Sequence, residues 1–370
     1  MAKQVQGSKV RYAVVGAGWI SQAAFMPGVA HTGNSEMTAI VTGDEEKAQA
    51  LGKRYGITST YHYDAYLKAL DSGEFDAIYL ALPNWQHREF AVPALERGLH
   101  VLLEKPMATS EEDCLAIQAA AEKTGAKLLL AYRLHFEPAT VEAIRMVRAG
   151  ELGKARLFTS AFSQHVSKDN HRAKHGFWAG PVADMGPYPI NACRNLFGAE
   201  PIEVMAMGLR HPEFGFDFDD SVSVTLRFPG NRMAQFTVAY GLNSHSHYRV
   251  QGTDGDLLVQ PGFAFPGPLK HTLTMGEKTT ERGFPAVDQF GGETQYLSDC
   301  VLHDRPVEPD GEEGLLDVRV VAAIGRALKT GRPQTLPPAV RDKYPTAAQV
   351  TTLSAVKPPP FVNAHEPSEG

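Results

Sequence analysis

The sequence predicts an α/β domain with a doubly wound parallel sheet, followed by an α+β domain with a large, mainly antiparallel open sheet. Over residues 10–132, short apolar runs alternate with helical patterns, which is the order of parallel strands joined by crossover helices. Beyond residue 155, strand-like segments follow one another closely, with turn signals between them. A chain of 370 residues with 43% hydrophobic residues is long enough to bury both cores.

The α/β part is expected to contain five strands and four helices. We expect strands at residues 10–15, 36–42, 76–82, 100–103 and 127–131, and helices at 19–30, 45–55, 86–97 and 111–124. Ligands of doubly wound sheets bind beyond the carboxyl ends of the strands. The residues that follow these strands are therefore expected to line one crevice: Gly16, Thr42, Leu82, Glu104 and Tyr132.

A glycine-rich turn follows the first strand. Gly16 permits a tight turn, and Gly18 allows the backbone to approach a pyrophosphate at the start of the next helix. Ser21 replaces the third glycine of the dinucleotide fingerprint and is small enough for close packing. A Gly-x-Gly after a strand also occurs in simple turns. We expect a dinucleotide site that includes Gly16, Gly18, Trp19 and Ile20.

The end of the second strand bears on the choice of cofactor. An acidic residue there would accept hydrogen bonds from an adenosine ribose and repel a 2′-phosphate. The strand ends instead in Thr42 and Gly43, and Asp44, one place later, is also a favoured helix N-cap. Thr42 can donate to a phosphate, and Lys47 lies in the next helical turn. We therefore expect NADP rather than NAD, bound in part by Thr42, Gly43 and Lys47.

Two later strands also end in polar residues. After the third predicted strand, Leu82 and Pro83 precede Asn84 and His87, which would both face the crevice, although Asn84 is equally compatible with a helix cap. After the fourth strand comes Glu104-Lys105-Pro106. Such a tripeptide is also compatible with a solvated turn, but its place at a strand exit favours a functional role.

These motifs, in this order and spacing, resemble those of the Gfo/Idh/MocA oxidoreductases. The segment from Ala131 to Pro138 is similar to the glucose-fructose oxidoreductase branch in particular. The resemblance implies a Rossmann domain that binds a nicotinamide cofactor. It also implies a second domain whose open sheet is covered by helices on one face and commonly forms oligomer contacts with the other. We therefore expect a homodimer or homotetramer.

A helical pattern at residues 139–148, ended by glycines that suit a C-terminal cap, leads from the first domain into the second. We expect domains at 1–135 and 136–344, and a proline-rich arm at 345–370 that is either solvated or lies against a neighbouring subunit. Strands are expected at 155–162, 202–207, 221–228, 233–240, 248–251 and 257–260. Further helices are expected at 184–197, 287–304 and 312–330.

Asp184 and Tyr188 would share one face of the helix at 184–197. Pro187 and Pro189 are tolerable only near a helix start. By themselves these residues are also compatible with an N-cap and a core tyrosine. The family resemblance implies an Asp-x-Gly-x-Tyr or His pattern here, whose last residue acts as acid–base; that residue is Tyr188.

A tyrosine with a pKa near 10 needs a nearby cation or hydrogen bonds to serve as a base at neutral pH. We therefore expect Lys105 to lie against Tyr188, to orient the substrate and to lower the pKa of the phenol. Asp184 is expected to bind a substrate hydroxyl or to anchor Lys105. Trp178 and Arg133 are candidates for the border of the sugar or cofactor site, with packing roles almost as well supported.

Composition excludes several classes of protein. The net charge is −6, and no basic tract suggests nucleic acid. No apolar run approaches 18 residues, and no signal peptide is recognisable, so we expect a cytoplasmic protein without membrane spans. The three cysteines lack C-x-x-C spacing. The pairs His171/His175 and His245/His247 lack an obvious third ligand, so we expect no metal.

The favoured hypothesis is an NADP-dependent oxidoreductase acting on a sugar or sugar-like polyol, by oxidising an aldose at C1 or reducing a lactone or ketose. One alternative is an NAD-dependent inositol or diol dehydrogenase. Another is a non-catalytic dinucleotide or sugar sensor, against which the presence of both Lys105 and Tyr188 argues.

Overall fold

The computed structural model describes residues 1–168 and 170–368, which form two compact units. Unit 1 contains Met1–Phe136, Asp288–Leu315 and Thr351–His365. Unit 2 contains Glu137–Val287, Leu316–Val350 and the chain from Glu366 on. The first junction therefore lies at Phe136, but two later segments return to unit 1, whereas the sequence suggested consecutive domains. Residues 369–370 of the expected arm lie outside the described residues.

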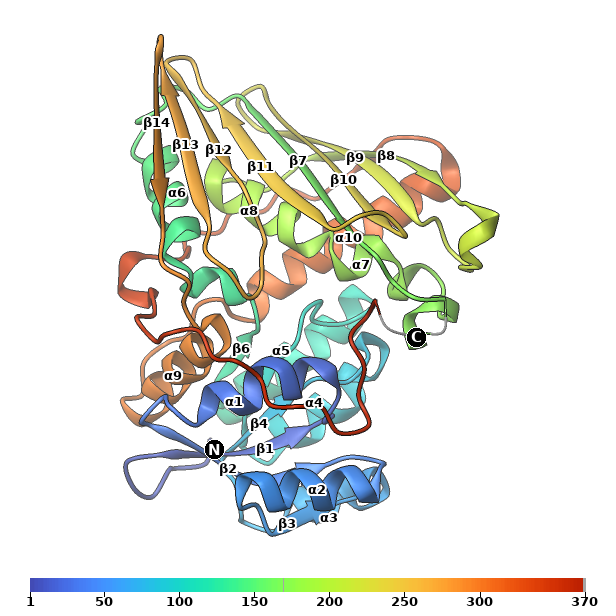
Figure 1. Cartoon of the computed structure of the whole chain (residues 1–370), viewed down its shortest axis with the longest axis vertical. Helices are drawn as coiled ribbons and strands as arrows, with labels where there is room; N and C mark the ends of the chain where they lie inside the picture. The colour runs from blue at the N-terminus through green and yellow to red at the C-terminus, as the bar shows by residue number, and fades with distance from the viewer. Residues whose placement is uncertain (169, 369–370) are drawn as a thin grey trace. The chain divides into compact units, whose positions relative to one another are not determined.

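Unit 1 is built on a six-stranded parallel sheet with the order β3-β2-β1-β4-β5-β6 (Figure 1). The strands are β1 (Val10–Val15), β2 (Ser35–Val41), β3 (Ser59–Tyr61), β4 (Ala77–Leu80), β5 (His100–Leu103) and β6 (Leu128–Leu130). All residues of β4 and β5 are buried, as expected for central strands of a sheet covered on both faces. The five predicted strands are confirmed. The short edge strand β3 was not predicted because its polar tripeptide carries no apolar run.

Side-chain caps mark the start of two helices of unit 1, α2 (Glu45–Tyr55) and α5 (Glu111–Thr124). Asp44 accepts a hydrogen bond from Lys47 N at the start of α2, and Ser110 accepts one from Asp113 N at the start of α5. Both helices match their predicted ranges. The other helices are η1 (Ser21–Phe25), α1 (Met26–Val29), η2 (Tyr63–Ala65), α3 (Tyr66–Leu70), η3 (Asn84–Gln86), α4 (His87–Glu96), η4 (Arg133–Phe136) and α9 (Gln289–Leu302).

The helix expected at 19–30 is not a regular α-helix. Its first part, η1, has π-helical geometry, and α1 follows it directly. Ser21 Oγ donates to Gly16 O at 2.5 Å, so the side chain that replaces the third glycine ties the helix to the turn. Within this unit, α9 packs against β1, where Ser298 Oγ lies 2.9 Å from Tyr12 Oη.

Unit 2 is built on a nine-stranded sheet with the order β14-β13-β12-β11-β7-β10-β9-β8-β15. Its strands are β7 (Leu157–Gln164), β8 (Glu203–Leu209), β9 (Ser221–Phe228), β10 (Arg232–Tyr240), β11 (His245–Gln251), β12 (Gly255–Val259), β13 (Lys270–Met275), β14 (Lys278–Gly283) and β15 (Gln334–Thr335). Only β7 and β10 pair in parallel. The predicted mainly antiparallel sheet is confirmed, but β13, β14 and β15 were not predicted. The strand β14 is exposed throughout and β15 has two residues, so neither carries an apolar pattern.

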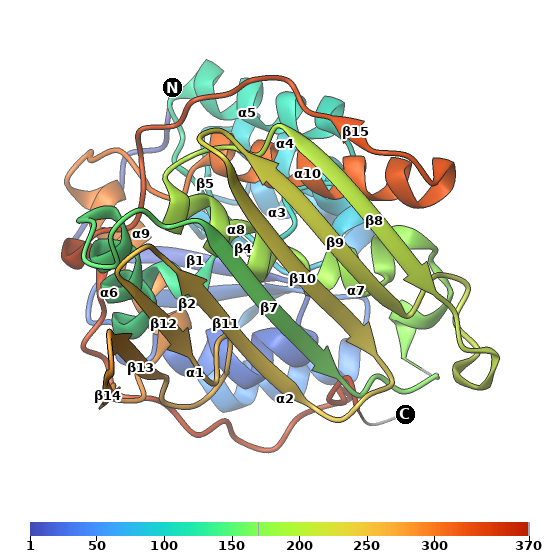
Figure 2. The ribbon, with the colours of Figure 1, turned by 90° about the horizontal axis from the view of Figure 1, so that it is seen from above.

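One face of this sheet is covered by helices, which lie behind it in Figure 2. They include α6 (Pro138–Arg148), α7 (Pro181–Asp184), α8 (Pro187–Phe197) and most of α10 (Gly311–Thr330). In β9 the buried residues alternate along the strand, as a half-covered sheet requires. The exposed large apolar residues of β8 and β10 are Met205, Met207, Leu209 and Met233. Among the described residues, no helix is both long and apolar enough to span a bilayer.

The short helical turns of unit 2 are η5 (His171–Lys174), η6 (Phe177–Ala179), η7 (Pro212–Phe214) and η8 (Ala347–Gln349). The side chain of His171, one of the histidines weighed above as a metal ligand, lies outside the described part of the structure.

Candidate active site

The turn after β1 is shaped for close approach of a ligand. Gly16 has φ +93°, and a Cβ there would lie 2.7 Å from Ala81 O, so only glycine fits. A Cβ on Gly18 would meet no atom within 4 Å, so the backbone there borders open space. Trp19 Nε1 is buried and has no hydrogen-bond partner among the described residues. An open backbone turn beside a buried, unused donor fits the phosphates of a dinucleotide.

After β2, Asp44 is the N-cap of α2, as its position before a helical pattern had indicated. Its Oδ1 accepts from Lys47 N at 2.9 Å, and Lys47 Nζ lies 3.9 Å from Oδ2. Backbone and side-chain hydrogen bonds, first that from Lys47, lower the pKa of Asp44. Thr42 is 5% exposed. A Cβ on Gly43 would lie 3.2 Å from the ring of Tyr63, so this ring closes one side of the strand end.

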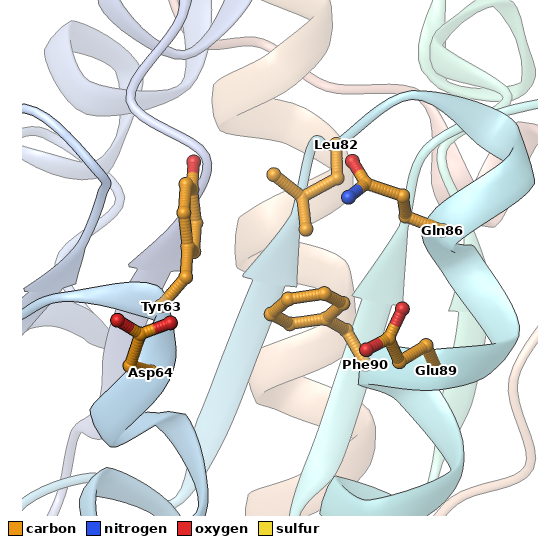
Figure 3. Close-up of a pocket in the computed structure, with 6 residues that line it drawn as sticks. All are labelled: Tyr63, Asp64, Leu82, Gln86, Glu89 and Phe90. Carbon is orange, nitrogen blue, oxygen red and sulfur yellow. The ribbon is translucent and has the colours of Figure 1, made fainter.

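A cavity of about 330 Å³ lies beside Tyr63, at the carboxyl ends of β3 and β4 (Figure 3). Tyr63 lies on one side of it, and Leu82 and Phe90 on the other. It is lined by Tyr63, Asp64, Leu82, Gln86, Glu89 and Phe90. Its size and its apolar side chains with polar groups at the edge are typical of a small-ligand pocket. Of these residues, only Leu82 was selected from the sequence.

His87 is buried rather than exposed to the crevice. Its ring is 1% exposed, with Nε2 2.9 Å from Leu82 O and Nδ1 3.0 Å from Pro106 O. Burial lowers the pKa of this imidazole. The ring thus ties the loop after β4 to the loop after β5. Asn84 and Pro83 lie in the first of these loops, where Asn84 begins η3.

Glu104 and Lys105 follow β5 directly. Glu104 Oε1 accepts from Tyr79 Oη at 2.7 Å, and Oε2 accepts from Lys105 N at 3.3 Å. Burial raises the pKa of Glu104, and the positive charge of Lys105 opposes that rise. Arg133, which is 6% exposed, donates from Nη1 to Gln289 Oε1 of α9. The strand end therefore carries a fixed carboxyl group and a neighbouring cation.

In unit 2, the predicted helix at 184–197 is two helices. Helix α7 ends at Asp184 and α8 begins at Pro187. Met185 and Gly186 lie between the two helices. A Cβ on Gly186 would lie 2.2 Å from Val182 O, so the interruption requires glycine. Pro187 occupies the first turn of α8, where its missing N–H costs no helical hydrogen bond. Asp184 thus stands at a helix end and Tyr188 at a helix start.

Asp184 is surrounded by donors from distant parts of unit 2. Its Oδ2 accepts from Tyr240 Oη at 2.8 Å and from Gln164 Nε2 at 3.4 Å, and lies 3.8 Å from Arg172 Nε. Burial raises the pKa of Tyr240 well above its ordinary value, so this phenol is a hydrogen-bond donor. None of these three partners was selected from the sequence, because no local motif marks them.

Tyr188 is partly exposed and packs among aromatic rings. Its ring lies 5.5 Å from that of Phe162, edge to face, and 5.7 Å from that of Phe263. These contacts restrict the ring's orientation. Trp178 packs edge to face on Phe177 at 5.6 Å. Lys105 and Tyr188 belong to different units, and their apposition stays a prediction.

The three cysteines are buried and unbridged. Over residues 1–168 and 170–368, no group of three or more His, Cys, Asp or Glu side chains is arranged to hold a metal ion.

A parallel sheet with a glycine turn after β1 and polar residues at its strand ends is typical of NAD(P)-dependent oxidoreductases. Two family descriptions match the chain: "Oxidoreductase family, NAD-binding Rossmann fold" over residues 10–132 and "GFO/IDH/MocA C-terminal domain" over residues 140–258. The chain belongs to the Gfo/Idh/MocA family of oxidoreductases and is an NAD(P)-dependent enzyme acting on CH–OH groups.

Three relatives illustrate the match. The chain is similar to the crystal structure of aldose-aldose oxidoreductase from Caulobacter crescentus complexed with glycerol, with TM-score 0.83, 33% identity and coverage of 89% of this chain and 100% of that chain. It is 29% identical to D-xylose 1-dehydrogenase [NADP(+)] of Haloarcula marismortui, covering 87% of this chain and 91% of the relative. It is 30% identical to D-xylose 1-dehydrogenase (NADP(+)) 2 of Haloferax volcanii, covering 86% and 98%.

Proposed function

We propose that this protein is an NADP-dependent oxidoreductase that moves a hydride between the nicotinamide and C1 of an aldose. The observation that carries the proposal is the glycine turn of unit 1, with its open backbone at Gly18 and the buried donor of Trp19. The relatives named above, an aldose-aldose oxidoreductase and two NADP-linked xylose dehydrogenases, support an aldose as substrate. The narrower resemblance to the glucose-fructose oxidoreductase branch has less support, since these relatives bear other names.

In this proposal, unit 1 binds the dinucleotide along its strand ends. The phosphates lie over the glycine turn, the 2′-phosphate lies by Thr42 and Lys47, and the adenine enters the cavity beside Tyr63. The full set is Gly16, Gly18, Trp19, Ile20, Thr42, Gly43, Lys47, Leu82, Pro83, Asn84, His87, Glu104, Lys105 and Arg133. His87 contributes by holding two of the loops together. The NAD(P) class follows from the family, and the preference for NADP is supported by the capped state of Asp44.

The bound nicotinamide supplies the hydride acceptor, and the residues of this chain supply position and proton transfer. Tyr188 takes the proton of the C1 hydroxyl as the C1–H hydride leaves, and returns it in the reverse direction. Lys105 holds the sugar oxygen and stabilises the phenolate of Tyr188 by its charge. Glu104, fixed by Tyr79, restrains the backbone of Lys105.

Asp184 is proposed to bind a sugar hydroxyl. As an acceptor-only carboxylate with neighbouring donors at Gln164 and Arg172, it offers a substrate both acceptors and donors at one place. Such an array suits the adjacent hydroxyls of an aldose or polyol. Trp178 is proposed to border the same pocket.

The exposed apolar residues of β8 and β10 support assembly of a homodimer or homotetramer through this face of the sheet. The family resemblance likewise implies oligomer contacts through the face of the sheet opposite its helices.

The purified protein should be assayed with NADP and NAD against aldoses, ketoses, inositols and diols, after any bound nucleotide has been released and identified. We expect NADPH formation with aldoses, seen at 340 nm. Turnover of inositols or diols with NAD would instead favour a dehydrogenase of that type. Intact cofactor binding without turnover of any substrate would favour a non-catalytic sensor.

A further inference from the structure

The last described part of unit 1 is an extended segment, residues 351–365, which we call the C-terminal arm. Thr351 N donates to Phe136 O at 3.0 Å, and Asp288 N donates to Leu353 O at 2.8 Å, so the arm starts fixed to the unit that it covers. It then runs past α1 (Figure 1). Pro358, Pro359 and Pro360 stiffen it, which reduces the conformational entropy lost when it is ordered.

The arm is bound to the helix that follows the phosphate turn. Val362 N donates to Gln22 Oε1 at 2.7 Å, and Gln22 Nε2 donates to Val362 O at 2.9 Å, so one side-chain amide pairs with the backbone of the arm in both directions. The same Gln22 Nε2 lies 2.9 Å from Ala17 O, inside the turn itself. Gln22 is 1% exposed. A buried amide therefore links the arm directly to the glycine turn.

The arm also reaches Asp44, in the turn between β2 and α2. Asn363 Nδ2 donates to Asp44 Oδ2 at 3.1 Å, while Asp44 Oδ1 caps α2. Asn363 has φ +44°, a left-handed conformation that asparagine tolerates better than most residues. Farther along α2, Arg54 Nη1 donates to Pro360 O at 2.7 Å. Both oxygens of Asp44 are therefore engaged by this chain.

We propose that the C-terminal arm is part of the cofactor site, where Asn363 occupies the carboxylate oxygen of Asp44 that a ribose diol would otherwise use. This inference rests on the proposed NADP-dependent function and adds a specificity-determining residue to it. An acidic residue at the end of β2 favours NAD by accepting hydrogen bonds from the ribose and repelling a 2′-phosphate. Asp44 lies beyond that strand end, in the turn before α2, and is the nearest carboxylate that could take this role. Asn363 competes with a ribose hydroxyl for Asp44 Oδ2, so it weakens the binding of NAD relative to that of NADP.

In the same proposal, the arm lies over the ribose of the bound dinucleotide, held there by its contacts with Gln22, Asp44 and Arg54. Release of the dinucleotide then requires the arm to part from Gln22, Asp44 and Arg54. The arm therefore also slows dissociation of the cofactor.

The test compares the full-length protein with Asn363→Ala, Arg54→Ala and Lys53→Ala. Binding of NADP and NAD is measured by calorimetry, and release of NADPH by stopped-flow fluorescence during displacement with excess NADP. Lys53 is exposed and lies beside Arg54 on α2, so Lys53→Ala removes an equal charge without removing the bond to Pro360.

For Asn363→Ala we expect the affinity for NADP relative to that for NAD to fall about 5-fold, because the freed oxygen of Asp44 can accept a ribose hydroxyl and one hydrogen bond contributes about 1 kcal/mol. NADPH release should be faster in both Asn363→Ala and Arg54→Ala, and unchanged in Lys53→Ala.

Equal NADP-to-NAD affinity ratios and equal release rates in all four proteins would overturn the role of the arm and leave the proposed function intact. If Arg54→Ala and Lys53→Ala changed the rate of NADPH release equally, the change would be a general effect of lost positive charge. That result would overturn the proposal that the arm slows cofactor release. If the unaltered protein binds neither dinucleotide, the proposed function itself fails, and the arm proposal with it.

Discussion

The two units assemble their candidate site residues in different ways. In unit 1, each residue follows a strand of one parallel sheet, so the topology alone brings Gly16, Thr42 and Glu104 to the same edge. In unit 2, Asp184 lies at a helix interruption and receives donors from β7, from η5 and from β10. A site at strand ends follows from chain order, whereas a site made by side chains from distant elements depends on tertiary packing.

The largest expected effect concerns the proton-transfer group of unit 2. Tyr188→Phe removes the phenol and keeps the aromatic packing on Phe162 and Phe263. We expect turnover of an aldose to fall by roughly 100-fold or more, since general acid–base catalysis typically contributes that much. NADP affinity should stay unchanged because unit 1 is intact. Steady-state kinetics and a binding titration measure both quantities, and a kcat within a few-fold of the original would remove Tyr188 from the mechanism.

In unit 1, the matching test is Gly16→Ala. The added Cβ would lie 2.7 Å from Ala81 O at φ +93°, so the turn must distort. We expect loss of detectable dinucleotide binding and a fall in unfolding free energy of about 1–2 kcal/mol, the cost of a left-handed residue. Calorimetry and urea unfolding check this, with Gly125→Ala, a helix end at φ +76°, as the control that shares only the stability cost. Cofactor affinity that is lost equally in both variants would contradict a local role of the turn.

The sequence predicted more of unit 1 than of unit 2, because local patterns determine the strand ends of unit 1 whereas tertiary packing brings the side chains of unit 2 together. The ranges of α2 and α5 follow from local caps at Asp44 and Ser110, and β1 from one apolar run before Gly16. The donors around Asp184 are far apart in the sequence and belong to no local pattern. The interruption at Gly186 was missed because the need for glycine arises from contact with Val182 O.

A smaller effect on activity is expected from a change in the donors around Asp184. Tyr240→Phe removes the 2.8 Å hydrogen bond to Asp184 and leaves the ring in place. We expect KM for the sugar to rise by about 10-fold, since a hydrogen bond to a charged group contributes about 1.5–3 kcal/mol, with a smaller change in kcat. Kinetics across a range of substrate concentrations separate the two. Ser223→Ala, which removes an exposed hydroxyl contact to Thr237 on the same sheet, should change neither. An unchanged KM in Tyr240→Phe would exclude Asp184 from substrate binding.

The smallest effect concerns stability, at a charge pair of unit 2 outside the proposed site. The hydrogen bond to Asp220 raises the pKa of His211 above its ordinary value of 6.5. The folded protein therefore holds the proton more tightly than the unfolded chain, and this stabilisation is full below pH 6.5 and is lost as the pH rises through the folded-state pKa. His211→Gln should lower the urea midpoint in acid more than in alkali. A midpoint difference that is constant with pH would contradict the linkage.

The most direct test of the central claim is a single turnover with D-xylose as the probe aldose. The protein, stripped of nucleotide and reloaded with one equivalent of NADP, is mixed with the sugar, and NADPH fluorescence is recorded. Our account predicts about one NADPH per chain in the unaltered protein and a strongly slowed signal in Tyr188→Phe. Full NADP binding without NADPH formation from xylose or any other aldose would contradict it.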